Sequence, residues 1–324
     1  MQTQEVAIKP TMKVFMKVDS EMLDEVIVVA YGTAKKSAFT GSASVVKADK
    51  LEKRQVSNIT NALSGSVAGV QTTSSNGQPG TSATVRIRGI GSMASSSNPL
   101  YVVDGIPFDG DISSINSQDI ETMTVLKDAA AAALYGARGA NGVILVTTKK
   151  GKEGKVSISV NTSMEFNQPF ILPRFQTRYG TGTGGKWVDG SSQSWGDKLS
   201  VSNYYGYNPK DDYFQTGIVN TESVSLSTGT EKNQTYASAA AINSKGYIPN
   251  NKYARYNFNV RNTTSFLNDK MTLDIAANYI LQNDRNVVNQ GEYNNPLVGA
   301  YLYPRGNEWA DAELYEVYDP ARKI

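Results

Sequence analysis

The most regular pattern in the chain is a two-residue alternation of apolar and polar side chains that begins at about residue 155. It is strong in residues 155–166, 253–261 and 271–281, and weaker in residues 219–228 and 235–243. Successive side chains of a β-strand point to opposite faces, so this period predicts antiparallel strands with one apolar face and one polar face. The strongest segments are also longer than the five or six residues, approximately, that are common in soluble sheets.

The connections between these strands differ in length on the two sides. Residues 229–232 make a short turn, whereas residues 167–216 form a long stretch rich in Gly, Trp and Tyr. Strands of about ten residues with short turns at one end and long loops at the other are typical of an outer-membrane barrel. An antiparallel sheet of a soluble protein alternates as well, so the pattern alone leaves both interpretations open.

Residues 42–150 differ from the rest and predict a mixed α/β domain. The predicted helices are residues 56–63, with Ser57 as N-cap, and an alanine-rich segment that follows Asp128 and is ended by Gly136. The predicted strands are 67–71, 84–88, 100–105, 119–126 and 143–148. Asp104-Gly105 and Asp109-Gly110 have the composition of turns, and Arg86 and Arg88 are expected to share one strand face and to make structural ion pairs.

A run of five apolar residues, Val26 to Ala30, stands near the start of the chain after Asp24 and Glu25. Its β-branched composition predicts a strand, but residues 33–40 are small, polar and basic and show no pattern that would pair with it. The sequence therefore predicts an extended strand without an obvious partner in its own chain, and the alternative is a strand that folds back on the domain that follows. A shorter alternation over residues 12–18 predicts the last strand of a preceding domain.

Composition removes several function classes. The 324 residues contain no Cys and no His, which excludes catalytic triads with His, Cys–His nucleophiles and His- or Cys-ligated zinc. A net charge of +2 without a basic stripe argues against nucleic-acid binding. No apolar run reaches the length of a transmembrane helix, and residues 1–10 lack the features of a signal peptide, which taken alone indicates a cytoplasmic protein.

Two glycine-rich motifs imitate nucleotide sites and are rejected. Residues 180–186 have the spacing of a phosphate-binding loop, but Trp187 stands where Ser or Thr would hold Mg²⁺. Residues 89–94 resemble a dinucleotide fingerprint, but a loop follows them where the helix should begin. No pair of carboxylates has acid–base spacing, so the sequence predicts no metal, no cofactor and no enzyme activity.

Long stretches of the middle domain resemble the plug domain of SusC/RagA-like TonB-dependent transporters. The resemblance is carried by residues 85–92 (VRIRGIGS), 98–107 (NPLYVVDGIP) and 119–144, and by the hairpin-like segment 246–253. It covers the chain from about residue 11 to its end. The resemblance implies an α+β plug domain followed by the first antiparallel strands of a transmembrane β-barrel, which in this family has about 22 strands.

The function that this resemblance implies is active import across the outer membrane of a Gram-negative cell. TonB, powered by ExbB and ExbD, would pull on an N-terminal segment and remodel the plug. The substrates would be oligosaccharides or peptides, captured with a SusD-like surface lipoprotein. The alternatives are a TonB-dependent receptor for iron chelates or signalling, and a soluble β-rich binding module.

The resemblance also assigns candidate residues. The TonB-interacting segment would comprise Asp24, Glu25, Val26, Ile27, Val28, Val29, Ala30 and Tyr31. The plug signature would comprise Arg86, Arg88, Gly89, Tyr101, Asp104, Gly105, Pro107, Asp128, Tyr135, Gly136, Arg138, Gly139, Asn141 and Gly142. Substrate contacts would come from Trp195, Tyr204, Tyr205 and Tyr207, although these aromatic residues fit a membrane interface equally well.

Family members are longer, begin with a signal peptide and often carry an immunoglobulin-like domain before the TonB segment. The expected organisation is therefore a remnant of that domain at 1–23, the TonB segment and linker at 24–41, the plug at 42–150 and a truncated barrel at 155–324. An open barrel exposes unpaired strand edges, which hydrocarbon does not tolerate. We therefore expect the chain to be a fragment that transports nothing by itself.

Overall fold

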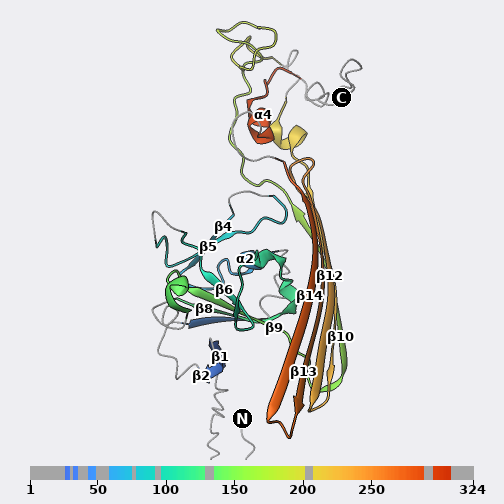
Figure 1. Ribbon diagram of the computed structural model, residues 1–324. Helices are drawn as coiled ribbons and strands as arrows, with labels where there is room; N and C mark the ends of the chain where they lie inside the picture. The colour runs from blue at the N-terminus through green and yellow to red at the C-terminus, as the bar shows by residue number, and fades with distance from the viewer. Residues whose placement is uncertain are drawn as a thin grey trace, which may run out of the picture.

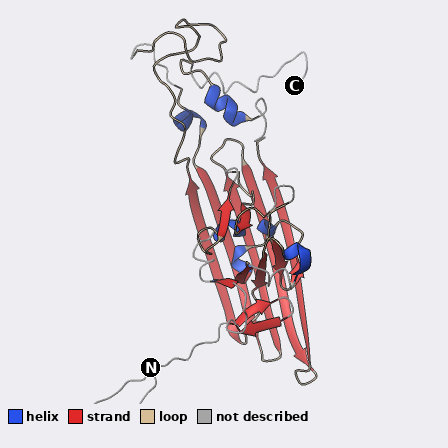
Figure 2. Ribbon diagram, turned by 90° about the vertical axis from the view of Figure 1, so that its left-hand side faces the viewer, coloured by secondary structure: helices blue, strands red, loops and turns tan. Residues whose placement is uncertain are grey.

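The computed structural model describes residues 26–29, 32–35, 43–48, 58–74, 78–91, 96–127, 135–200, 207–287 and 295–307. They form a mixed α/β domain at the position predicted for the plug and a tall sheet of five strands (Figure 1). The plug domain lies against the concave face of this sheet, and Figure 2 looks onto that face with the plug domain in front. None of the helices in these ranges is long and apolar enough to cross a membrane. The strand predicted within residues 12–18 lies outside the described residues.

The plug domain is built on a five-stranded mixed sheet. In spatial order its strands are β3 (Ala43–Lys47), β8 (Ile120–Leu126), β9 (Val143–Thr148), β6 (Leu100–Val103) and β7 (Ile106–Pro107). Strand β9 is central, and its run of apolar residues packs alternately into a cluster on each face, with Ile144 on one side and Leu145 on the other. Strands β4 (Val70–Thr73) and β5 (Thr84–Ile87) form a separate antiparallel pair. The predicted α+β plug is therefore confirmed.

Local predictions in the plug domain need three corrections. The first helix is only α2 (Ile59–Ala62), and its N-cap is Asn58 rather than Ser57, because the Asn58 side chain accepts from the Thr60 N–H at 2.9 Å. Strand β4 begins later than predicted, because Gly69 turns the chain with φ of +77°. Arg88 lies beyond β5 with φ of +59°, so it does not share a strand face with Arg86. The predicted helix after Asp128 lies largely outside the described residues.

The second body is a sheet of long antiparallel strands that pair in chain order, which we call the wall. Its strands are β10 (Gly154–Asn167), β11 (Gly217–Gly229), β12 (Asn233–Lys245), β13 (Lys252–Phe266) and β14 (Met271–Arg285). Every predicted strand is present and extends beyond its predicted bounds. With 13 to 15 residues each, these strands exceed the roughly 9–11 residues that a tilted membrane strand needs.

The two faces of the wall are the reverse of those in a soluble sheet. In β13 the polar side chains Arg255, Asn257 and Asn259 are buried against the plug domain, whereas Tyr256 and Phe258 point away from it, and Phe258 is 53% exposed. A soluble sheet would bury the apolar face and expose the polar one. The alternation therefore marks a wall with an apolar outer face and a polar inner face.

The N-terminal apolar run has a partner that the sequence did not indicate. Strand β1 (Val26–Val29) pairs antiparallel with β2 (Gly32–Lys35), with Val26 opposite Lys35 and Val29 opposite Gly32. The prediction of an unpaired strand is therefore wrong. The remaining members of the predicted TonB segment, Asp24, Glu25, Ala30 and Tyr31, lie outside the described residues.

Above the wall in Figure 1, the loops that join its strands pack into a small body of their own, which we call the upper body. It contains the short helices η5 (Pro209–Tyr213) and α4 (Pro296–Leu302). Its buried core is formed by Tyr207, Tyr213, Ile248 and Ala300. The connections at the lower end, such as the turn closed by Thr230 N–H donating to the Asn233 carbonyl at 2.7 Å, are short. The predicted asymmetry of loop lengths is present.

Candidate functional site: the contact between plug and wall

Three groups of polar side chains join the plug domain to the inner face of the wall. The upper group comes from β13, where the Arg255 guanidinium donates to the Ser113 carbonyl and the Asn257 amide donates to the Ser114 carbonyl at 2.8 Å. Both carbonyls belong to the one-turn helix η2 (Ile112–Ser114), whose last carbonyls have no partner within the helix. Arg255 is 1% exposed, so its charge is removed from water and depends on this contact.

The middle group centres on a buried carboxylate of the plug domain. Asp119 ends the helix η3 (Ser117–Asp119) and accepts a hydrogen bond from the Tyr236 hydroxyl of β12 at 2.9 Å. Burial raises the pKa of Asp119, and hydrogen bonds from Ser238, Tyr236 and Asn116 oppose that rise. The pKa of this carboxyl therefore depends on the contact, because both its burial and the Tyr236 hydrogen bond involve the wall.

The lower group is an ion network centred on Arg261 of β13. Its guanidinium makes two hydrogen bonds to the Asp274 carboxylate, at 2.8 and 2.9 Å, and an ion pair with Asp104 of the plug domain at 3.0 Å. Lys150 adds a further ion pair to Asp274 at 2.8 Å. Arg261 is thus shared between the wall and the plug domain, and its planar donor set suits such a two-sided contact.

Asp104 was predicted only as a turn former and has a second role. It does form the turn between β6 and β7, with φ of +48° followed by +88° at Gly105, which suits a two-residue hairpin turn. Its carboxylate also accepts from the Thr148 N–H at 2.9 Å and hydroxyl at 2.6 Å. The turn therefore holds the acid at the end of β9, where it meets Arg261.

Most other residues of the predicted plug signature shape the domain itself. Asn141 donates to the Ser96 carbonyl at 2.8 Å, and Gly142 has φ of +89° and space for no Cβ, which would come within 2.7 Å of Ile87. Gly89 and Gly136 also have positive φ. The remaining described positions are Tyr101 and Tyr135, half-buried against the core clusters, the buried Gly139, the exposed Pro107, and Arg138, which pairs with Asp109 at the surface. Asp128 lies outside the described residues.

The residues that join the plug domain to the wall were not predicted from the sequence. Arg86 and Arg88 were the expected ion-pair donors, but the arginines that bridge plug and wall are Arg255 and Arg261. A signal was present: both lie on the polar face of a strand whose other face is apolar. Charges at inward positions of such a strand must find partners inside.

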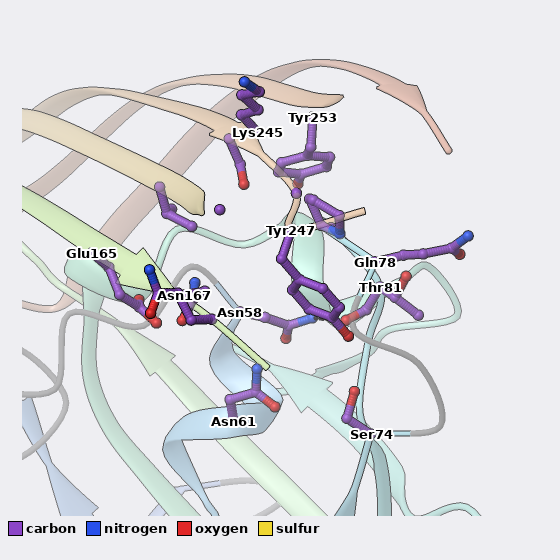
Figure 3. Close-up of a pocket in the computed structure, with 17 residues that line it drawn as sticks. Asn58, Asn61, Ser74, Gln78, Thr81, Glu165, Asn167, Lys245, Tyr247 and Tyr253 are labelled. Atoms are coloured by element: carbon purple, nitrogen blue, oxygen red, sulfur yellow. Dashed lines mark hydrogen bonds between the residues drawn. The ribbon is translucent and has the colours of Figure 1, made fainter. Parts of the chain in front are cut away.

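A pocket of about 300 Å³ lies above these contacts, between the top of the plug domain and the upper ends of β10–β12 (Figure 3). The plug domain contributes Asn61 and neighbouring loop residues, and the wall contributes Glu165 and Asn167. Tyr247, from the turn between β12 and β13, stands among them (Figure 3). The predicted family hairpin at residues 246–253 is thus part of a cavity wall.

One loop of the plug domain touches both the wall and the upper body beside this pocket. Gln78 donates to the Val287 carbonyl at 2.5 Å, and Asn286 donates to the Pro79 carbonyl at 3.4 Å. Gly80 lies so close to the Tyr253 ring that a Cβ at this position would come within 2.3 Å of it. The position of this loop is therefore linked to that of the upper body.

The predicted substrate aromatics fall into three situations. Trp195 is 58% exposed and its ring lies 6.1 Å from that of Tyr179, so it presents a ring face to solvent. Tyr207 is only 2% exposed, and its hydroxyl donates to the Ala300 carbonyl at 2.7 Å. The buried ring of Tyr207 has no free face for stacking and instead holds the upper body together. Tyr204 and Tyr205 lie outside the described residues.

Comparisons with known proteins agree with this arrangement. A family model of the TonB-dependent receptor plug domain matches residues 35–143. The TonB-dependent receptor SusC of Bacteroides thetaiotaomicron is 37% identical over 289 residues, which cover 86% of this chain and 28% of SusC. The TonB-dependent receptor P39 of Formosa agariphila is 33% identical over 336 residues, which cover 97% of this chain and 32% of P39.

Among solved structures, the RagAB peptide importer in its open-open state is similar with a TM-score of 0.68 and 29% identity, covering 83% of this chain and 33% of that one. A plug domain packed inside a wall with an apolar outer face defines the class of TonB-dependent receptors. Within that class, this chain belongs to the SusC/RagA-like group. It spans between 28% and 33% of the length of these relatives.

Proposed function

We propose that this chain is the gate-bearing part of an outer-membrane importer that takes up oligosaccharides or peptides with energy from TonB. The observation that carries the proposal is the inverted wall: an apolar outer face suits lipid, and the polar inner face binds the plug domain through side chains rather than through an apolar core. Such a contact can be broken and remade, because its polar groups can return to water. The importer of which this chain would be a part moves its substrate without changing any of the substrate's bonds.

The proposed partners follow from the same relatives. RagAB is a peptide importer, and we propose that this protein works with a SusD-like surface lipoprotein. The proposed energy source is TonB with ExbB and ExbD. The proposed location is the outer membrane, with the apolar face of β10–β14 in lipid.

We further propose that residues 24–31 are the segment that TonB binds by strand addition. In the described residues β1 pairs only with β2, so its other edge is open for strand addition. Val28→Pro, introduced into the protein at its natural length, should weaken TonB binding, since proline removes a main-chain donor. Equal capture of TonB by both versions would exclude strand addition at this site.

A cross-link between plug and wall tests the gate. The sequence contains no cysteine, so Ser114→Cys with Asn257→Cys supplies the two thiols for a short bifunctional reagent. Locking this pair should stop the TonB-dependent uptake of labelled hexasaccharide and hexapeptide probes. The matched control is Thr228→Cys with Thr235→Cys, a paired position within the wall, which should not affect uptake. Full uptake with the plug locked would contradict the proposal.

A further inference from the structure

We propose that the pocket in Figure 3 binds one neutral sugar unit of an oligosaccharide, which makes it a specificity site between plug and wall. This inference rests on the proposed import function and deepens it, because that function leaves oligosaccharides and peptides open. The volume of about 300 Å³ is at the small end of the range for ligand pockets, roughly 300–1,000 Å³. It therefore suits one unit of a chain rather than a whole oligomer.

The wall side of the pocket is formed where three strands end together. Register places Glu165 of β10 opposite Val219 of β11, and Val219 opposite Ser244 of β12. All three residues line the pocket. Because paired residues of neighbouring strands point to the same face, the pocket has a rigid inner side rather than a loop.

Several polar side chains around the pocket lack partners in the folded chain. The side chains of Asn61 from the plug domain and of Glu165 and Asn167 from the wall make no hydrogen bond within the described part of the protein. In Figure 3, Glu165, Asn167 and Asn61 lie along one side of the pocket. Two amides and a carboxylate offer both donors and acceptors, which is what neighbouring hydroxyl groups of a sugar require.

An aromatic ring completes the pocket. Tyr247 stands opposite the amides in Figure 3 and is held by the ring of Phe214, 6.1 Å away between centroids. Burial raises the pKa of Tyr247, which keeps its hydroxyl neutral. A fixed ring opposite hydrogen-bonding groups can lie against the apolar face of a sugar while the amides bind its hydroxyls.

The charge of the lining selects among ligands. Glu165 is the one acid among the residues that line the pocket, whereas the Lys245 ammonium points away from the other labelled residues (Figure 3). A uronic acid, or the free carboxylate of a short peptide, would therefore meet a negative charge without an inward cation to balance it. The lining also lacks an apolar recess for peptide side chains, so the residues favour a neutral sugar.

The test measures binding by the protein at its natural length in detergent, using maltohexaose, cellohexaose, xylohexaose, mannohexaose, hexagalacturonate and hexaalanine as probes. We expect at least one neutral hexasaccharide to bind, and Asn61→Ala to raise its Kd about tenfold, the effect of one lost hydrogen bond. Tyr247→Phe keeps the ring and should retain binding. Lys252→Ala is the matched control and should leave the Kd unchanged, because this exposed lysine pairs with Lys245 on the neighbouring strand but does not line the pocket.

Three results would overturn the proposal. The first is binding of hexaalanine or hexagalacturonate but of no neutral hexasaccharide. The second is an unchanged Kd for the saccharide in Asn61→Ala. The third is loss of saccharide binding in Lys252→Ala. Uptake by cells with and without TonB separates this proposal from the function it rests on. TonB-dependent uptake that is the same in the pocket variants as in wild type contradicts the sugar site alone. Saccharide binding at the pocket without TonB-dependent uptake contradicts the import function alone.

Discussion

Replacing Arg261 by leucine should lower the free energy needed to release the plug domain from the wall more than any other single truncation. The guanidinium is 7% exposed as a side chain and faces Asp104 and Asp274, whose side chains are 22% and 28% exposed. Leucine is shorter and uncharged, so both carboxylates lose their main cation. Each then keeps one alternative: Asp104 retains its bonds from Thr148, and Asp274 retains Lys150.

The expected cost follows from this geometry. Removing one partner of a buried ion pair typically costs about 3–5 kcal/mol, because the other charge stays buried and uncompensated. The surviving partners of Asp104 and Asp274 compensate part of this loss, so we expect about 3 kcal/mol in the free energy of plug release. Arg261→Lys keeps a charge near Asp104 and loses the two-point contact with Asp274, which lies within the wall, so it should affect plug release less than Arg261→Leu.

The cost is measured by titrating the membrane-embedded protein with urea, at concentrations that leave the wall folded. Protease cleavage of the plug domain is followed as the readout of plug release. A double-mutant cycle of Arg261→Leu with Asp104→Asn isolates the contact between wall and plug, and we expect a coupling energy of about 1–3 kcal/mol. Asp274→Asn serves as the comparison, because it removes a contact within the wall. A coupling energy between Arg261 and Asp104 indistinguishable from zero would refute the assignment of Arg261 as a bridge.

Three further changes test other contacts. Burial raises the pKa of Asp119 above its ordinary value of 3.8, so the charged carboxylate destabilises the folded state and this destabilisation is lost as pH falls through the raised pKa. The difference in unfolding free energy between Asp119→Asn and wild type, measured by urea titration, should therefore shrink on acidification. A difference that stays constant with pH would contradict this. Gly80→Ala should make plug release easier than Gly69→Ala does. Both glycines have φ near +80°, but only a Cβ at Gly80 would come within 2.3 Å of a ring, that of Tyr253. Equal effects in the cleavage assay would exclude that contact. Tyr207→Phe should cost the upper body about 1 kcal/mol through one buried hydrogen bond, measured as faster proteolysis of the upper loops; unchanged proteolysis would argue against that role.

The long strands were predictable because their signal is local. Each wall segment repeats apolar and polar residues with a period of two, and the register needs no information from elsewhere in the chain. The plug strands were predictable for a similar reason, since β9 reads as a continuous buried run. Errors arose at ends and turns, where single residues decide: Asn58 replaces Ser57 as the cap because its side chain also reaches the Thr81 carbonyl at 3.1 Å.

The contacts between plug and wall were not predictable, because their partners are distant in sequence and each has a simpler local role. Asp104 looks like a turn residue, and Arg261 looks like one more residue on a polar strand face. Their contact exists only because β9 carries Thr148 to the same level as β13. The pairing of β1 with β2 was missed because Ala30-Tyr31 lacks the Asn-Gly or Asp-Gly composition of the favoured hairpin turns.

The central claim is that the wall is inverted, with lipid outside and the plug domain inside. Single cysteines at each position from Ala254 to Arg261, carrying a nitroxide spin label in native outer membranes, test it through accessibility to oxygen, which concentrates in lipid. We expect high oxygen accessibility at Ala254, Tyr256, Phe258 and Val260, and low accessibility at Arg255, Asn257, Asn259 and Arg261. The opposite alternation, or equal accessibility at all eight positions, would contradict it.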